Sequence, residues 1–213
     1  MALFDLKVGT SMDLQTALQR YLSREQLNAI GKVKVGIAGA GGLGSNCAAC
    51  LVRSGFRDLR IVDFDRVEPG NLNRQFFFAD QVGLPKVEAL GENLRRIEPA
   101  LRLELIRERI TAQNAAQLFQ HADVLLECVD KPAVKELLVQ CFVPTGKLVI
   151  AASGIAGWGR SDDIGIRKVR ANFYLVGDEQ SSIDTLPPLA PQVAVAAAKQ
   201  ADILLACVLR QLD

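Results

Sequence analysis

Cysteine and histidine are scarce in this chain, and neither basic nor acidic residues prevail. Five irregularly spaced cysteines in 213 residues are too few for a disulfide framework. A single histidine, His121, excludes a metal site built from several histidines. The 25 basic and 24 acidic residues leave a net charge of +1, which argues against a nucleic-acid-binding protein and against a polybasic membrane-surface protein.

The chain also has no uninterrupted hydrophobic run long enough to span a membrane. Its most apolar late stretch, 193–209, contains Lys199, Gln200 and Asp202. The N-terminal MALFDLKVGTSMDL shows no basic region followed by an apolar core, so no signal peptide is expected. These absences predict a cytoplasmic protein without membrane or nucleic-acid partners.

What the chain does contain is a steady alternation of strand and helix patterns. Strands are expected at 33–38, 59–62, 101–106, 123–126, 147–150 and 172–176, and helices at 11–30, 44–54, 85–97, 115–119, 132–142 and 191–212. This order predicts an α/β, Rossmann-like fold, a mostly parallel sheet with helices on both faces and an extra C-terminal strand and helix. We expect a single domain, 1–213, made of an N-terminal helical segment (11–30), a nucleotide-binding core (31–155) and a C-terminal part (156–213).

A glycine loop lies directly between the first core strand and the next helix. The sequence GAGGLG at 39–44 matches G-x-G-x-x-G. In that pattern Gly39 makes the tight turn, Gly41 lets the backbone approach a phosphate, and Gly44 allows close helix packing. Asp63 ends the following strand, where it can accept a hydrogen bond from a ribose hydroxyl. The loop and its acid predict a bound nucleotide.

Two cations and an acid beyond the strand ends favour a triphosphate over a dinucleotide. The turn-rich stretch DFDRVEPGNLNRQ, 63–75, contains Arg74, and Lys86 stands near the start of the next helix. Cleavage of a triphosphate needs positive charge over the developing negative charge, which Arg and Lys supply. Asp130, at the end of a further strand, can hold Mg²⁺ through water.

At this point the motifs resemble a known family. GAGGLGS, DFDRVEPGNLNRQ, GLPK and ECVD, in that order, are similar to the motifs of the ThiF/MoeB/HesA family, relatives of ubiquitin-activating enzymes. The later VIAASGIAGWG, RKVRANFYLVGD and LAPQVAVAAAKQA look like the short ThiF-type branch. The resemblance implies ATP- and Mg²⁺-dependent adenylation of the C-terminal glycine carboxylate of a ubiquitin-like sulfur carrier ending in Gly-Gly, a ThiS-like protein of thiamine thiazole biosynthesis.

The same resemblance assigns roles to residues. The implied nucleotide-binding set is Gly39, Gly41, Gly42, Gly44, Asp63, Asp65, Asn71, Asn73, Arg74, Lys86 and Asp130. Arg74, Lys86 and Asp130 are implied to be catalytic, Asp130 through Mg²⁺ on the nucleotide. No general base is required, because a carboxylate is already ionised at neutral pH. Family members also lend an N-terminal arginine to the ATP of a dimer partner; Arg24 is the best match and Arg20 the next, which implies a homodimer.

The chain departs from the family pattern at several positions. Glycine stands at Gly70, where serine is usual, and lysine at Lys131, where asparagine is usual. Many relatives carry two C-x-x-C pairs that hold zinc, whereas the one C-x-x-C here, 47–50, is expected to be helical core, so no zinc site is expected. No cysteine lies between Cys141 and Cys207, so we expect a separate sulfur donor.

Two other functions stay open on the sequence. An NAD-dependent oxidoreductase would use the same glycine loop and Asp63, and a non-catalytic scaffold would keep the nucleotide pocket only for binding. The presence of Arg74 and Lys86, and the lack of a placed histidine as proton donor, favour adenylation. Trp158, between two glycines, is expected to anchor its loop on the sheet, with a cover over the carrier's tail as the alternative.

Overall fold

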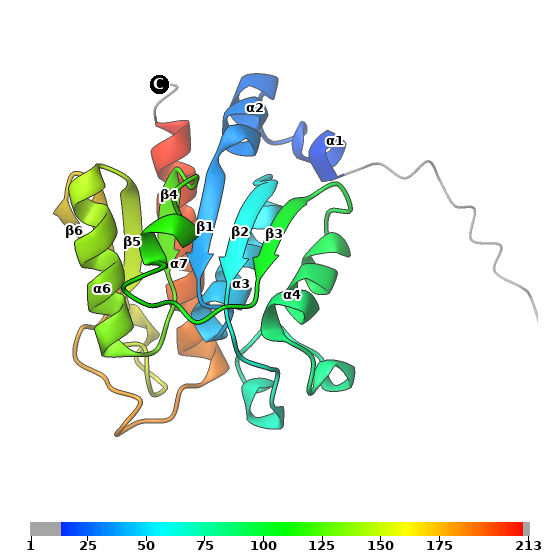
Figure 1. The fold of residues 1–213 in the computed structure, drawn as a ribbon. Coiled ribbons are helices and arrows are strands. Elements are labelled where there is room, and N and C mark those ends of the chain that lie inside the picture. The colour runs from blue at the N-terminus through cyan, green and yellow to red at the C-terminus, as the bar shows by residue number, and fades with distance from the viewer. Residues whose placement is uncertain (1–13, 211–213) are drawn as a thin grey trace, which may run out of the picture.

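The computed structural model describes residues 14–210, and in them seven strands form a single sheet. The strand order is β3-β2-β1-β4-β5-β7-β6. The strands are β1 (Lys34–Ala38), β2 (Asp58–Val62), β3 (Arg102–Ile106), β4 (Val124–Glu127), β5 (Leu148–Ala152), β6 (Gly165–Arg170) and β7 (Phe173–Gly177). Every neighbouring pair is parallel except β6 and β7 (Figure 1). The predicted Rossmann-like α/β fold is confirmed.

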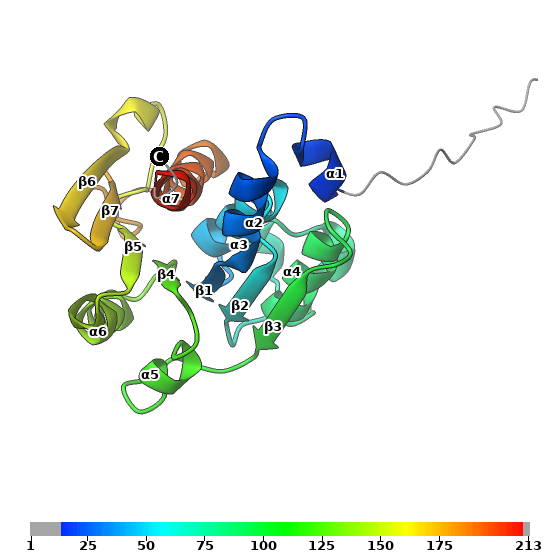
Figure 2. The same cartoon turned by 90° about the horizontal axis from the view of Figure 1, so that it is seen from above.

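Helices cover the sheet on both faces, as Figure 2 shows from above. They are α1 (Leu14–Leu18), α2 (Arg24–Lys32), α3 (Gly42–Arg53), α4 (Lys86–Arg95), α5 (Ala115–Leu118), α6 (Pro132–Phe142) and α7 (Ala190–Leu209), with short 3₁₀ turns at Pro69–Asn71, Ala79–Gln81, Val143–Thr145 and Ser161–Asp163. Helices α3, α4 and α7 lie on one face, and α5 and α6 on the other. Each face buries its own apolar cluster, because alternate strand residues point to opposite sides.

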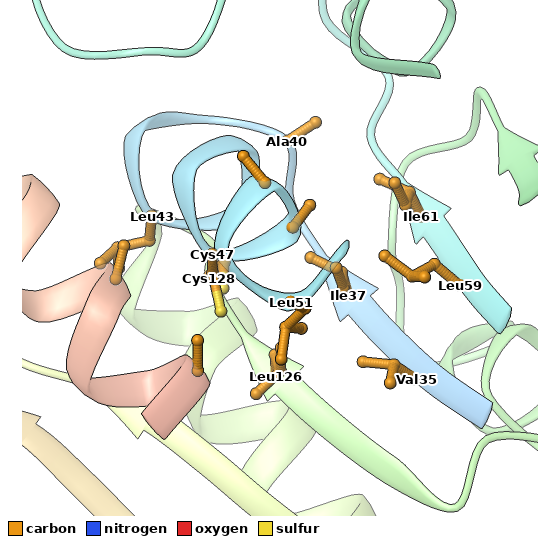
Figure 3. Close-up of a cluster of buried hydrophobic side chains, with 14 of the residues drawn as sticks. Val35, Ile37, Ala40, Leu43, Cys47, Leu51, Leu59, Ile61, Leu126 and Cys128 are labelled. Atoms are coloured by element: carbon orange, nitrogen blue, oxygen red, sulfur yellow. The ribbon is translucent and has the colours of Figure 1, made fainter. Parts of the chain in front are cut away.

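The larger cluster lies directly beneath the glycine loop. Val35 and Ile37 of β1 and Leu126 of β4 point toward α3, where they meet Leu51 and the fully buried Cys47 (Figure 3). This packing holds the first turn of α3 against the sheet, so that the loop preceding it is fixed in position.

The N-terminal helical segment differs from its prediction. The leucine spacing over 11–30 indicated one helix, whereas the structure has α1 and α2 with a break between them; 11–13 lie outside the described residues. Ser23 ends the break: its Oγ accepts from the backbone N–H of Gln26, and the Gln26 side chain accepts from Ser23 N–H. This capping box begins α2 at Arg24. The spacing of the leucines alone did not show that one helix ends and another begins here.

The strand β6 was not placed by the sequence patterns. All six of its residues are exposed, so it lacks the alternation of buried and exposed positions that marks a half-buried strand. Antiparallel pairing with β7 places it at the edge of the sheet, where charged side chains such as Arg167 and Arg170 are tolerated.

Helix α7 is long and apolar enough, by length and composition, to cross a membrane. In this structure 44% of its most apolar window is buried inside the protein. It packs along α3 and against β5. The buried Gln200 side chain donates to the carbonyls of Glu127 and Ile150, each at 3.2 Å, which ties the helix to two strands. All-round apolarity is typical of a buried helix.

Candidate functional site

The carboxyl ends of β1, β2 and β4 meet at the point where the strand order reverses. Ala38 pairs in register with Val62 on one side and with Glu127 on the other, so the three strands end at one level. From β1 the sheet runs outward to β2 and β3 on one side and to β4 and β5 on the other. In such sheets ligands bind in the crevice beyond the strand ends at this switch point.

The glycine loop has the geometry that its pattern predicts. Gly39 has φ +98°, and a Cβ there would lie 2.7 Å from the Cys128 carbonyl oxygen. A Cβ on Gly44 would overlap the Gly39 carbonyl oxygen, so the first and third glycines are sterically required. Gly41 precedes α3 without a side-chain cap, which leaves the N–H groups of the first turn available to an anion.

Asp63 fastens the glycine loop to the end of β2. Its Oδ2 accepts from Ala40 N–H at 2.7 Å, and its Oδ1 accepts from Asp65 N–H at 2.8 Å. Burial raises the pKa of the Asp63 carboxyl, and these two backbone donors together with Lys86 oppose that rise. An ionised carboxylate has about four acceptor positions, so capacity for a ribose hydroxyl remains.

The loop that carries Arg74 is held against the glycine loop. The Arg74 stem lies 3.6 Å from where a Cβ on Gly42 would be. Its Nη1 donates to the Gly70 carbonyl at 3.2 Å and to Asn73 Oδ1 at 2.7 Å. Asn71 Oδ1 accepts from the backbone N–H of Glu68, which closes the turn before it. The Arg74 stem is therefore held beside the start of α3, and its guanidinium is held within its own turn.

Lys86 is the first residue of α4 and is almost fully buried. Its Nζ forms an ion pair with Asp65 Oδ2 at 3.1 Å, and its backbone N–H donates to the Asp65 carbonyl. The Lys86 side chain is 9% exposed and that of Asp65 is 46% exposed. Because its partner Asp65 is partly solvated, the Lys86 ammonium can turn to a phosphate that enters from the solvent side.

Asp130 lies three residues beyond β4 and is exposed at the same edge of the sheet. Among the residues that the structure describes, no three histidine, cysteine, aspartate or glutamate side chains gather as metal ligands. A divalent cation here would therefore depend on phosphate oxygens with one carboxylate, which is how Mg²⁺ is commonly held. Asp130 fits that role.

Two side chains of α3 that the sequence analysis did not single out join these loops. Ser45 Oγ donates to the Gly41 carbonyl at 2.7 Å and accepts from Phe76 N–H at 3.0 Å. Asn46 Nδ2 donates to the carbonyls of Gly42 and Arg74, at 2.7 and 2.8 Å. Ser45 and Asn46 follow Gly44 immediately in the sequence. Their partners lie in a loop some 30 residues further on, so no pattern near Ser45 and Asn46 in the sequence indicates these contacts.

Replacing Asn46 by alanine is expected to weaken ATP binding about tenfold. In the wild type the Asn46 side chain joins the Arg74 loop to the glycine loop by hydrogen bonds to one carbonyl of each. Alanine cannot make these bonds, and their loss costs about 1–2 kcal/mol of the free energy that holds the two loops in place. Calorimetric titration with ATP measures the loss, with Asn46→Asp as the matched variant because it keeps the size and removes the donors. Unchanged affinity in both variants would show that the tether does not hold the site.

A second unpredicted pair stabilises the turn before Asp130. Glu127, fully buried, receives Lys135 Nζ at 3.0 Å on both oxygens and accepts from Val129 N–H at 2.9 Å. Lys135 also donates to the Ala152 carbonyl, so β4, β5 and α6 meet at one ion pair. Burial raises the pKa of the Glu127 carboxyl, and Lys135 opposes that rise. The sequence analysis did not single out Glu127, although a glutamate inside an apolar strand is a signal that could have marked it.

The structure does not bring Arg24 to the other predicted residues. It is the first residue of α2 and is exposed, and α2 leads into the amino end of β1 (Figure 1). The glycine loop lies at the opposite end of that strand. Arg24 can act on a nucleotide only in a second copy of the chain, and Arg20, also exposed, shares this position. The other predicted residues lie at the opposite edge of the sheet, on the loops beyond the strand ends and in the first turns of α3 and α4.

Comparison with known proteins agrees with this architecture. Residues 12–211 match the ThiF family. The chain belongs to the ThiF family. Among ThiF-like relatives, the adenylyltransferase and sulfurtransferase UBA4 of Lodderomyces elongisporus is 32% identical over 154 residues, 70% of this chain and 34% of that protein. UBA4 of Yarrowia lipolytica is 34% identical over 58% of this chain and 31% of its own. The chain thus spans about a third of these curated relatives.

Solved structures show that this ThiF-family fold is shared more widely. Escherichia coli tRNA N6-threonylcarbamoyladenosine dehydratase, TcdA, in complex with ATP, superposes with a TM-score of 0.80 at 20% identity, over 94% of this chain and 96% of that one. E. coli MccB with AMPCPP and MccA gives 0.70 at 23% identity, over 86% and 57%. At such identities the likeness establishes the fold.

Proposed function

We propose that this chain adenylates the C-terminal carboxylate of a ubiquitin-like sulfur carrier, with ATP as the nucleotide donor and pyrophosphate as the product. The observation that carries the proposal is the convergence, at one switch point, of an uncapped helix N-terminus, the Arg74 guanidinium and the buried Lys86 ammonium. A site for an intact dinucleotide has no need of two side-chain cations beside the glycine loop. Transfer of a nucleotidyl group does need them.

The chemistry follows from these groups. A carboxylate oxygen attacks the α-phosphorus of ATP, the bond from that phosphorus to the bridging oxygen breaks, and pyrophosphate leaves. Arg74 and Lys86 stabilise the negative charge that accumulates on the phosphates, and the α3 N-terminus contributes its N–H groups. Asp63 holds the loop and accepts from the ribose, while Asp130 would hold Mg²⁺ that arrives with the triphosphate.

The known relatives support this reading of the site. The curated fungal relatives are named adenylyltransferase and sulfurtransferase, and TcdA and MccB were solved with ATP and with AMPCPP. The proposal extends to a ThiS-like carrier of thiamine thiazole biosynthesis and to a separate sulfur donor. All five cysteines are free, and Cys47 and Cys128 lie in the core, where burial raises the pKa of both thiols. A buried neutral thiol is a poor nucleophile.

The proposal also includes a cytoplasmic homodimer. Free cysteines are typical of a reducing compartment. The C-terminal half of α7 keeps Leu205, Val208 and Leu209 only half buried, which suits a second copy of the chain. In such a dimer Arg24 would be supplied to the partner's nucleotide.

ATP–pyrophosphate exchange with Mg²⁺ tests the proposal. Exchange is expected with a ubiquitin-like carrier ending in Gly-Gly, and a carrier lacking the last glycine is the matched control. No exchange with any such carrier, together with tight NAD binding, would instead support an oxidoreductase. ATP consumption driven by tRNA and not by a carrier would also contradict the proposal.

A further inference from the structure

A pocket of about 290 Å³ lies between the loop after β5 and the loop before α7. The two loops are bonded together: Gly157 N–H donates to the Pro187 carbonyl at 2.9 Å, and Ala156 N–H donates to Ser181 Oγ at 3.0 Å. Both lie at the carboxyl end of the sheet (Figure 1). Trp158, expected to anchor its loop by packing on the sheet, is instead 62% exposed and lines this pocket, so that expectation was wrong.

The pocket adjoins the nucleotide site through two contacts. Asn73 Nδ2, next to Arg74, donates to the Pro188 carbonyl at 3.1 Å. A Cβ on Gly42 of the glycine loop would come within 2.9 Å of Val193, the neighbour of Gln192. A chain lying in the pocket would therefore have its end close to the phosphates.

Gln192 stands in the first turn of α7 and lines the pocket, but one of its polar atoms is unpaired. The residue is 2% exposed, and its Oε1 is buried with no hydrogen-bond partner. A buried acceptor without a donor costs free energy, so such an atom calls for an explanation. The Gly157 backbone, with φ +93°, lies alongside: a Cβ there would be 3.8 Å from Gln192 Nε2 and 3.1 Å from Leu186.

We infer that Gln192 binds the backbone of the carrier's extended C-terminal tail, its Oε1 accepting a peptide N–H when the tail enters the pocket. This rests on the proposed function. A glycine tail offers N–H donors and no side chains, which suits a pocket walled by Trp158 and Leu186. Oε1 is an acceptor only, so it selects a donor such as an amide N–H. Gln192 is thereby a specificity residue for the acyl substrate and does not contact ATP.

The test combines Gln192→Leu with tails whose glycines carry an N-methyl group. Gln192→Leu should raise the KM for the carrier about fivefold to tenfold and leave the KM for ATP unchanged. N-methylation of the contacted glycine should raise the wild-type KM by a similar factor and add nothing in the variant. Because the orphan acceptor is removed, the thermal midpoint should stay the same or rise, which a merely structural role would not produce.

Gln140→Leu, on the exposed face of α6, is the matched control, and Gln192→Met replaces the leucine variant if that protein does not fold. An unchanged carrier KM in Gln192→Leu, or an N-methyl penalty equal in both proteins, would overturn the inference while wild-type exchange leaves the proposed function standing. Absence of carrier-dependent exchange in the wild type would overturn both.

Discussion

Replacing Lys86 by alanine is expected to lower carrier-dependent ATP–pyrophosphate exchange on the order of 10²–10³-fold. The substitution removes the buried ammonium and leaves Asp65 and Asp63 facing the incoming triphosphate without a compensating cation. Charge loss and added repulsion act on the same step, since negative charge accumulates on the departing pyrophosphate. The measurement is the exchange rate at saturating ATP and carrier.

The fold should survive this change. Asp65 is 46% exposed in the ion pair, so solvent screens it and losing the pair costs at most about 1 kcal/mol. Lys32→Ala, at the exposed end of α2 and far from the site, is the control for a lost lysine. An exchange rate of Lys86→Ala within threefold of the wild-type rate would show that Lys86 takes no part in the adenylation step.

Gly44→Ala is expected to abolish nucleotide binding and to destabilise the protein by roughly 3 kcal/mol or more. The new Cβ would overlap the carbonyl oxygen of Gly39, a backbone atom that cannot move without opening the tight turn at φ +98°. The turn is fixed in place, since Gly39 N–H donates to the Val62 carbonyl at 2.8 Å. Thermal unfolding and ATP titration together measure the effect.

Gly70→Ala is the matched control within the same site. A Cβ on Gly70 meets nothing within 4 Å, so the variant should unfold and bind ATP as the wild type does. That outcome would also show that position 70, where the family usually has serine, has space for a side chain larger than that of glycine. Equal behaviour of the two variants would contradict the steric account of the loop.

The sequence predicted six of the seven strands and the glycine loop between the first strand and the next helix. Buried β-branched runs, the G-x-G-x-x-G spacing and acids just past strand ends depend on local chemistry, and parallel strands bring such residues to one edge. For this reason the structure brings Asp63, Arg74 and Lys86 to the same edge of the sheet. Their roles toward ATP stay predictions.

What the sequence could not supply depends on contacts between distant segments. Asn46 donates to the Arg74 carbonyl, Glu127 pairs with Lys135, and the unpartnered Oε1 of Gln192 is buried where two distant loops meet. Strand β6 has no buried face, and its antiparallel pairing with β7 holds it in the sheet. The break before α2, by contrast, was readable from Ser23 and its capping box.

The most direct test of the central claim is the fate of carboxylate oxygen. A carrier labelled with ¹⁸O in its C-terminal carboxylate is incubated with ATP, Mg²⁺ and a thiol acceptor, and the AMP is examined by mass spectrometry. If the carboxylate attacks the α-phosphorus, one labelled oxygen becomes the bridging atom of the acyl-adenylate and leaves with AMP. AMP formed without label would contradict adenylation and would mean that water, not the carrier, attacks the nucleotide.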